Sequence, residues 1–367
     1  MLFQIRKARF WIGLGISLAF MLLLVWTIDS QQIVVELRKA NYLFLIPAVL
    51  LYFISIYFRS IRWKHLLSPV ATIRISKLYP VIIVGYMANN LLPVRLGELV
   101  RAYYLSRRED VSGTASLASI AVERVFDGIT LLIFCFTAVP ILYFLGAFDA
   151  TSELHRASAI LFAFLSLGLF GLSLVLFNFM ASNKFDNISS YFLRFIPARF
   201  KPHASTLIQQ FSQGLATLRS IRSQMKIVLL SLPVWLTECG VYASVAYGFG
   251  IPEYFESQLV FLTAILLVTA TSNLVTAIPS SIGGIGPFEV VAQQTLVALG
   301  LNASLGATYS GFVHIIALWL PVNIVGIILV WSHNLSLSKL TDLAKPGNNI
   351  RNDTANKNRN EHPGAQL

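Results

Sequence analysis

A set of ionisable side chains lies within otherwise apolar stretches of this sequence. An unpaired charge in hydrocarbon costs about 3 kcal/mol on insertion scales, so such residues usually face a partner or a polar cavity. Arginines and carboxylates placed together can pair with one another, and arginine also binds the oxygens of a phosphate. The candidates for binding a charged ligand are therefore Arg95, Glu98, Arg101, Glu123, Arg124, Asp127, Glu238 and Glu289.

The spacing of these charges predicts ion pairs within helices. Glu98 and Arg101 are three residues apart, Glu123 and Asp127 are four apart, and Arg124 is three from Asp127. Residues three or four apart are neighbours on a helix surface. We expect these charges to neutralise one another at rest and to offer an arginine to a lipid phosphate on opening. The alternative for Glu123 and Arg124 is that they lie at headgroup depth and only anchor a helix end.

Other polar residues are weaker candidates for a functional site. Glu238 lies in the middle of an apolar run, which favours either a proton-relay or counter-ion role, or a buried carboxyl whose hydrogen bonds are satisfied. His314 and Asn323 are single polar residues, and such residues often only join neighbouring helices. Cys135 and Cys239 both lie in apolar runs, so no disulfide framework or metal cluster is predicted.

Two apolar segments, 78–105 and 259–301, are interrupted by proline and glycine beside charge. The interruptions read LeuLeuProValArgLeuGlyGlu (91 to 98) and IleProSerSerIleGlyGlyIleGlyProPheGlu (278 to 289). A straight helix cannot continue through them without losing backbone hydrogen bonds, so both segments are predicted to be broken or re-entrant hairpins. The helix-breaking residues are Pro93, Gly97, Pro279, Gly283, Gly284 and Gly286. A new helix is expected from Pro287, with free amides for an anion.

The elements around these breaks read as membrane helices. Of the 367 residues 56% are hydrophobic and only 12% are charged, about half the charge usual in a soluble domain. A membrane helix needs about 20 apolar residues. We therefore predict an all-α polytopic fold with about six full spans and the two hairpins, in one domain, 1–332. The spans are 10–28, 42–58, 125–145, 158–180, 227–249 and 306–331.

The polar segments predict how the chain sits in the membrane. Basic residues concentrate between the apolar runs, notably Arg59 and Arg62 after the second span and a connector at 181–226. By the positive-inside rule these segments, both termini and the tail 333–367 should be cytoplasmic, in the inner (plasma) membrane. The connector contains a helical stretch, 203–222, either on the inner leaflet or simply solvated. The net charge of +11 is spread over these segments, so no nucleic-acid partner is expected.

Four motifs resemble the lysylphosphatidylglycerol synthase transmembrane region family, also described as flippase-like membrane proteins. They are ArgSerIleArgTrpLysHisLeuLeu (59 to 67), AsnAsnLeuLeuProValArgLeuGlyGlu with a following Arg101 (89 to 101), GluArgValPheAsp (123 to 127), and the second interruption. The resemblance extends over most of the chain up to Trp331. It implies that the family's motif positions are occupied by Asn90, Pro93, Arg95, Gly97, Glu98, Arg101, Glu123, Arg124, Asp127, Gly284, Gly286 and Glu289.

The resemblance also implies a function, which is to move an amphipathic lipid between membrane leaflets. Bifunctional members carry an aminoacyltransferase domain after the membrane part, whereas this chain continues into a short polar tail, so lipid lysylation is not expected. The sequence shows no nucleotide-binding loop and no hydrolase motif. We expect a transporter for a lipid with an anionic or zwitterionic headgroup, not an enzyme, without a cofactor. The alternatives are an accessory subunit or enzyme of glycolipid or polyprenyl-phosphate-linked envelope synthesis, beside a partner enzyme, and a non-transporting scaffold.

Overall fold

The computed structural model describes residues 29–92, 96–109, 111–147, 201–276 and 283–332, with a few isolated positions before and between them. These ranges form helices joined by turns, and they contain no strand. The predicted spans 10–28 and 158–180 and the tail 333–367 lie outside the described residues. Within those ranges, the prediction of an all-α polytopic membrane protein is confirmed.

Five helical stretches have the length and apolar composition to cross a membrane: 42–67, 113–144, 221–248, 258–276 and 303–332. They correspond to η1 (Tyr42–Phe44) with α3 (Leu45–Leu67), α6 (Gly113–Phe144), α10 (Ile221–Gly248), α11 (Gln258–Thr276), and α13 (Ala303–Gly311) with η6 (Phe312–Trp319) and α14 (Leu320–Ser332). Four predicted spans fall on these stretches, although α3 continues to residue 67 and α6 begins at residue 113. The fifth, α11, was predicted to be one arm of a hairpin.

The first interrupted segment folds into a helical hairpin. α4 (Ile75–Leu91) and α5 (Gly97–Arg108) pack against each other. Gly85 lies against Arg101, and Asn89 lies against Gly97, so the two helices run antiparallel. A Cβ atom on Gly97 would lie 2.1 Å from the carbonyl oxygen of Gly85. The glycine predicted to break the helix therefore also allows the two arms to touch.

The second interrupted segment also folds back on itself. α11 packs against α12 (Pro287–Val297), which begins at the proline predicted to start it. Gly283, Gly284 and Gly286 have φ values of 62°, 79° and 97°, a backbone region that glycine adopts without steric cost. A Cβ atom on Gly283 would lie 3.2 Å from the carbonyl oxygen of Asn90, so the two hairpin tips lie against each other.

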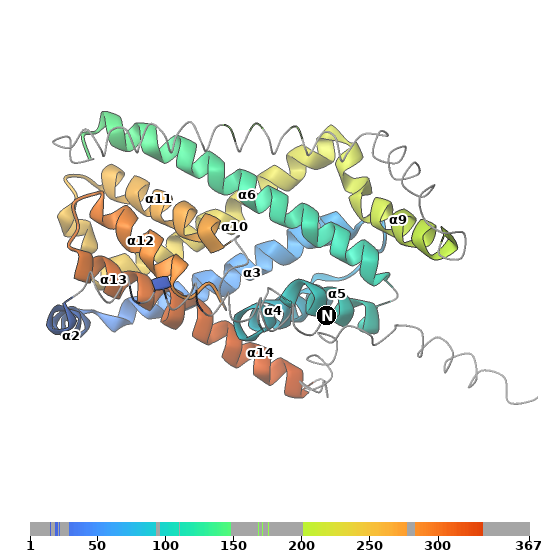
Figure 1. The fold of residues 1–367 in the computed structure, drawn as a ribbon, viewed down its shortest axis with the longest axis horizontal. Helices are drawn as coiled ribbons and strands as arrows, with labels where there is room; N and C mark the ends of the chain where they lie inside the picture. Colours follow the sequence, from blue (N-terminus) through green and yellow to red (C-terminus); the bar gives the residue numbers. More distant parts are fainter. Residues whose placement is uncertain are drawn as a thin grey trace, which may run out of the picture.

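Long helices hold the two hairpins in place. Figure 1 shows α6 running along the length of the molecule, with α11 and α12 near one of its ends and α5 near the other. Its 32 residues make a helix of about 48 Å, longer than the ~30 Å hydrocarbon core. α3 and α10 pack against each other, and both also contact α6. Trp63 of α3 is fully buried and donates to Ser119 of α6 over 3.0 Å.

The connector before α10 packs onto the bundle. α9 (Lys201–Leu215) contacts α6, where Gly214 lies close to Ala115 and Ala118. The helical stretch predicted at 203–222 is divided in the structure: α9 is followed by a short 3-10 turn, and α10 already begins at Ile221. A short helix before the bundle, α2 (Ser30–Lys39), packs against α13.

Candidate functional site

A cavity of about 510 Å³ lies where the two hairpin tips meet α3, α6, α10 and η6. We call it the central cavity. Its volume falls within the ~300–1,000 Å³ typical of small-molecule sites. Leu117, Ile120, Leu131, Leu274 and Leu318 give it apolar walls. Several residues predicted from sequence line its polar part: Asn90, Glu98, Arg124, Asp127, Glu238, Gly283 and Gly284.

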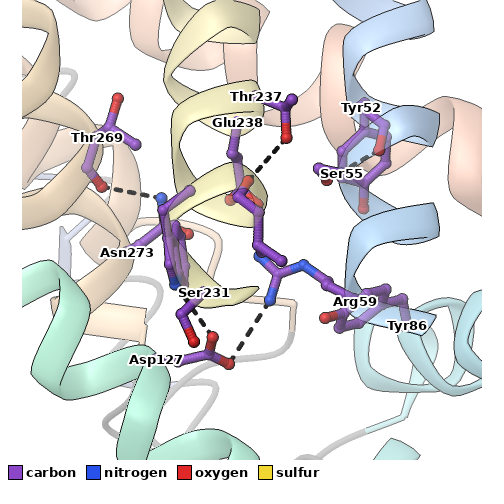
Figure 2. A network of polar contacts seen from close by, with 12 residues as sticks. Tyr52, Ser55, Arg59, Tyr86, Asp127, Ser231, Thr237, Glu238, Thr269 and Asn273 are labelled. Carbon is purple, nitrogen blue, oxygen red and sulfur yellow. Dashed lines mark hydrogen bonds and ion pairs between the residues drawn. The ribbon is translucent and has the colours of Figure 1, made fainter. Parts of the chain in front are cut away.

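Arg59 links two of the predicted carboxylates across the cavity wall. Figure 2 shows its side chain reaching from α3 to Asp127 on α6 and Glu238 on α10. The guanidinium lies 2.5 Å from Glu238 Oε2 and 3.6 Å from Asp127 Oδ2. All three side chains are at most 7% exposed. Removing one partner of a buried ion pair strongly destabilises the folded protein, because the other charge stays buried without compensation.

A second layer of charge lies deeper, around Glu123, whose side chain is fully buried. Arg101 approaches it to 2.7 Å, Arg62 to 3.3 Å and Arg124 to 3.3 Å. Arg62 also contacts Asp127 at 2.8 Å, which joins the two layers. We refer to these seven residues as the charge network: Arg59, Arg62, Arg101, Arg124, Glu123, Asp127 and Glu238.

Aromatic side chains complete the surroundings of this network. Trp235 Nε1 donates to Asp127 Oδ1 over 3.1 Å, and its ring lies 4.7 Å from the Arg59 guanidinium. Arg101 stacks over Trp63 at 3.7 Å. A cation on a desolvated aromatic face gains about 2 kcal/mol. These rings therefore stabilise arginines that have left water.

Arg59 and Arg124 both line the cavity, and Arg124 has the more exposed side chain. Its side chain is 32% exposed, whereas those of the other three are at most 5% exposed. It pairs with Asp127 at 3.4 Å, as its three-residue spacing predicted. The four guanidiniums of the network face three carboxylates, which leaves one positive charge, and Arg124 presents it to the cavity. A guanidinium in this position suits an anionic oxygen of a ligand.

The tip of the first hairpin contributes amides and one carboxylate. The Asn89 side chain accepts a hydrogen bond from the Gly97 amide at 2.8 Å and donates one to the Glu98 carboxylate at 3.3 Å. Glu98 is half-buried and has no ion-pair partner among the described residues. Asn90 donates to Asn323 of α14 over 3.3 Å. The cavity is therefore lined by the partly exposed Arg124 on α6 and by the Glu98 carboxylate at this tip.

The tip of the second hairpin is fixed by Glu289. One carboxylate oxygen accepts the Gly286 amide over 2.7 Å, and the other lies 2.6 Å from Nδ1 of His314. The imidazole stacks on Phe288, with 4.2 Å between ring centroids. His314 lines the central cavity, while Glu289 lies behind it. Glu289 thus acts on the cavity through the glycine tip and the histidine.

The structure sorts the candidates predicted from sequence into three groups. The first group lines the cavity and consists of Asn90, Glu98, Arg124, Asp127, Glu238, Gly283 and Gly284. The second group, Arg101, Glu123 and Glu289, lies behind the cavity wall and supports it. Arg95, Pro93 and Pro279 lie outside the described residues. No group of three or more His, Cys, Asp or Glu residues able to hold a metal occurs in the described ranges. Cys135 and Cys239 are free thiols.

One expectation about charge is wrong. The sequence predicts that the second span ends at residue 58 and that Arg59 and Arg62 follow it in a basic cytoplasmic stretch, but α3 continues to Leu67 and both arginines lie inside it, at most 4% exposed. Their three-residue spacing was the available signal, because it places both cations on one side of a helix that simply continues past residue 58. Their partners are 61 or more positions further along the chain, so no local pattern could pair them.

These features define a polytopic helical membrane protein with a charged cavity enclosed between two helical hairpins. The chain belongs to the lysylphosphatidylglycerol synthase TM region family, whose sequence model matches residues 10–325. The resemblance seen in the motifs is thereby confirmed.

Curated relatives fall into two kinds. Stand-alone UPF0104 membrane proteins include one from Pyrococcus horikoshii, 23% identical over 348 residues, covering 88% of this chain and 97% of that protein. Another, from Methanothermobacter thermautotrophicus, is 24% identical over 354 residues, covering 92% of this chain and 99% of that protein. The glycosyltransferase AglD of Haloferax volcanii is 23% identical over 316 residues, which is 80% of this chain. The match spans only 49% of AglD, so this chain corresponds to about half of it. No solved structure matches the chain.

Proposed function

We propose that this chain moves an amphipathic lipid with an anionic or zwitterionic headgroup between the leaflets of the inner membrane. The observation that carries the proposal is the partly exposed Arg124 side chain, which lines a cavity bounded by two broken helices. Broken helices at mid-membrane are where transporters bind polar substrates. A lipid phosphate would pair with Arg124, and its apolar part would meet the leucine side chains of the cavity wall.

Other groups of the cavity suit the rest of a headgroup. The half-buried carboxylate of Glu98 would accept hydrogen bonds from an amine or a hydroxyl group. The Trp319 Nε1 atom is buried beside Gly283 and has no hydrogen-bond partner in the described ranges. A buried donor without a partner costs about 1–3 kcal/mol, which a headgroup oxygen would recover. These features support a polar ligand at the place where the tips meet.

Transport is tested with purified protein in liposomes that carry fluorescent phospholipids with phosphoglycerol, phosphocholine or phosphoethanolamine headgroups. The fraction of label reaching the opposite leaflet is followed by chemical quenching from outside. Arg124→Gln should slow transport at least tenfold, equivalent to about 1.4 kcal/mol. Arg124→Lys should retain part of the rate, because an ammonium lacks the planar fork of a guanidinium. Arg222→Gln, an exposed arginine at the start of α10, is the matched control.

Each variant must also keep the thermal unfolding temperature of the folded protein within a few degrees of the wild type. Transport by Arg124→Gln at the wild-type rate would refute headgroup binding by this residue. No transport by the wild type, whatever the headgroup, would refute the function itself.

The likeness to a protein named as a glycosyltransferase favours a second candidate, an accessory subunit or enzyme in glycolipid or polyprenyl-phosphate-linked synthesis. A polyprenyl phosphate offers Arg124 the same anionic oxygens. Chromatography of the liposome lipids separates the two candidates when the assay is repeated with a polyprenyl phosphate in the membrane and with a nucleotide sugar and an aminoacyl-tRNA as group donors. Movement of the label with unchanged lipids supports a transporter, while a new glycosylated or aminoacylated lipid supports an enzyme.

A further inference from the structure

The contact between His314 and Glu289 joins an imidazole, which has two ring nitrogens able to hold a proton, to a carboxyl group. The Nδ1 and Oε1 atoms are 2.6 Å apart, and the two side chains are 9% and 5% exposed. When Glu289 is ionised it can only accept, and Nδ1 then carries the hydrogen of this contact. The second ring nitrogen, Nε2, is then the position that gains or loses a proton.

Nε2 is placed to exchange that proton with the cavity. His314 lines the central cavity, and no hydrogen bond to its Nε2 atom is found in the described ranges. The ring is fixed on its other side by stacking on Phe288. Its segment, η6, is a π-helix, a rare form that occurs frequently at functional sites. The imidazole thus has a fixed orientation and one open nitrogen.

The Glu289 carboxylate links His314 to the tip of the second hairpin. Glu289 Oε2 accepts the Gly286 amide at the tip of the second hairpin. A proton on His314 changes the charge of the pair from negative to neutral, and therefore changes the negative charge available to that amide. The tip in turn touches Asn90 at the tip of the first hairpin.

The elements packed against η6 carry other titratable or charged groups. The buried ones are Tyr52, Arg59 and Arg62 on α3, Glu238 and Tyr242 on α10, and Tyr309 on α13, while His65 on α3 and Cys239 on α10 are partly buried. Arg59 and Glu238 neutralise each other at 2.5 Å, and the phenols stay neutral near pH 7. The described part of α14 carries no charged side chain. Of the two histidines on η6 and these helices, His314 lines the central cavity and His65 of α3 does not.

We propose that His314 and Glu289 form a proton-binding site that couples lipid movement to a pH difference across the membrane. This inference rests on the proposed function. Protonation at Nε2 converts a hydrogen-bonded neutral imidazole into an imidazolium paired with Glu289. That change acts on the hairpin tip through the Gly286 amide. His and carboxylate groups serve as proton relays in other membrane transporters.

The first experiment detects the proton without requiring transport. Protein with ¹⁵N-labelled histidine in lipid nanodiscs is titrated from pH 5 to 9, and the His314 signals are assigned by their loss in His314→Gln. We expect these signals to report a protonation step that is displaced in Glu289→Gln. His314 signals that stay constant over this range would overturn the proton site.

The second experiment measures the steady-state distribution of a fluorescent phospholipid between the leaflets of liposomes with a pH difference of about one unit. One proton moved per lipid would shift the leaflet ratio by up to about tenfold. His314→Gln and Glu289→Gln should return the ratio to its value without a gradient. His65→Gln, whose imidazole contacts Ser223 at 2.9 Å and does not line the cavity, should respond as the wild type does.

The outcomes separate the two proposals. Wild-type protein that equilibrates lipid but shows no response to the pH difference would overturn the coupling and leave the proposed function standing. Wild-type protein that moves no lipid under any condition would refute the proposed function, and the coupling with it. A gradient response that persists in both variants would also overturn the assignment to this pair.

Discussion

Replacing Arg101 and Glu123 together is expected to destabilise the protein less than the sum of the two single replacements. The two side chains are 2.7 Å apart and at most 4% exposed. Charges about 4 Å apart interact by about 4 kcal/mol at an effective dielectric constant of about 20. Removing one partner leaves the other buried with less compensation, whereas removing both deletes the charge and its counter-charge.

The magnitudes follow from the other contacts of each residue. Glu123→Gln removes the carboxylate that three arginines share, so we expect a loss of about 3–5 kcal/mol in the free energy of unfolding. Arg101→Gln leaves Glu123 with Arg62 and Arg124, both at 3.3 Å, so its loss should be smaller, about 2–3 kcal/mol. The double variant should recover at least about 2 kcal/mol of the summed loss, within the range measured for residues in contact.

The assay is unfolding of the purified protein in detergent, by heat and by denaturant, for the two single variants and the double variant. An exposed pair gives the control: Lys77 lies 2.9 Å from Glu109 with its side chain 55% exposed. Lys77→Gln should change the free energy of unfolding by less than about 1 kcal/mol. Additivity of Arg101→Gln and Glu123→Gln within about 0.5 kcal/mol would refute the view that these charges act as a pair.

Three further predictions concern packing, topology and the cavity wall. Gly97→Ala should destabilise the first hairpin by at least about 2 kcal/mol, because the added Cβ atom would overlap a backbone oxygen. Gly311→Ala is the control: a Cβ atom there meets open space, so the melting temperature should stay unchanged or rise. In a variant without native cysteines, a cysteine at Ser220 should react only with reagents from the cytoplasm and one at Ser257 only from outside; labelling of both from one side would contradict the proposed orientation. Trp235→Phe removes the 3.1 Å hydrogen bond to the network's aspartate and should lower the free energy of unfolding by about 1–3 kcal/mol in denaturant titrations; an unchanged value would show that the bond is not needed.

The hairpins were predictable from sequence because their signals are local. Proline and glycine beside charge mark a break wherever they occur in an apolar run, and the structure has both breaks, including the helix that starts at Pro287. The pair predicted between Arg124 and Asp127 forms, whereas the predicted pair of Glu98 and Arg101 is wrong, because Arg101 pairs with Glu123. The first pair depends on helix geometry alone.

The rest of the site depends on contacts between distant segments. The sequence shows a basic run at Arg59 and Arg62 and an isolated acid at Glu238, but nothing in it states that α3 and α10 pack together. Arg101 has Glu98 in reach along its own helix, yet it pairs with Glu123 of α6. His314 and Glu289 were each considered alone for the same reason. The tertiary fold decides these pairs, because more than one partner satisfies the spacing rules.

The bond between Arg59 and Glu238 has a consequence for how the protein is made. The two residues are 179 positions apart, and a ribosome adding about 5–20 residues per second needs roughly 10–35 seconds to cover that distance. During this time α3 has already left the ribosome while the carboxylate of α10 has not been synthesised. A guanidinium in hydrocarbon is unfavourable by about 2.5–3.5 kcal/mol on insertion scales, so the nascent helix must wait at the translocon, at the membrane surface or beside the earlier acids of α6. The ion pair between Arg59 and Glu238 therefore forms only after α10 has been synthesised, whereas the contact between Arg59 and Asp127 of α6 can form before it.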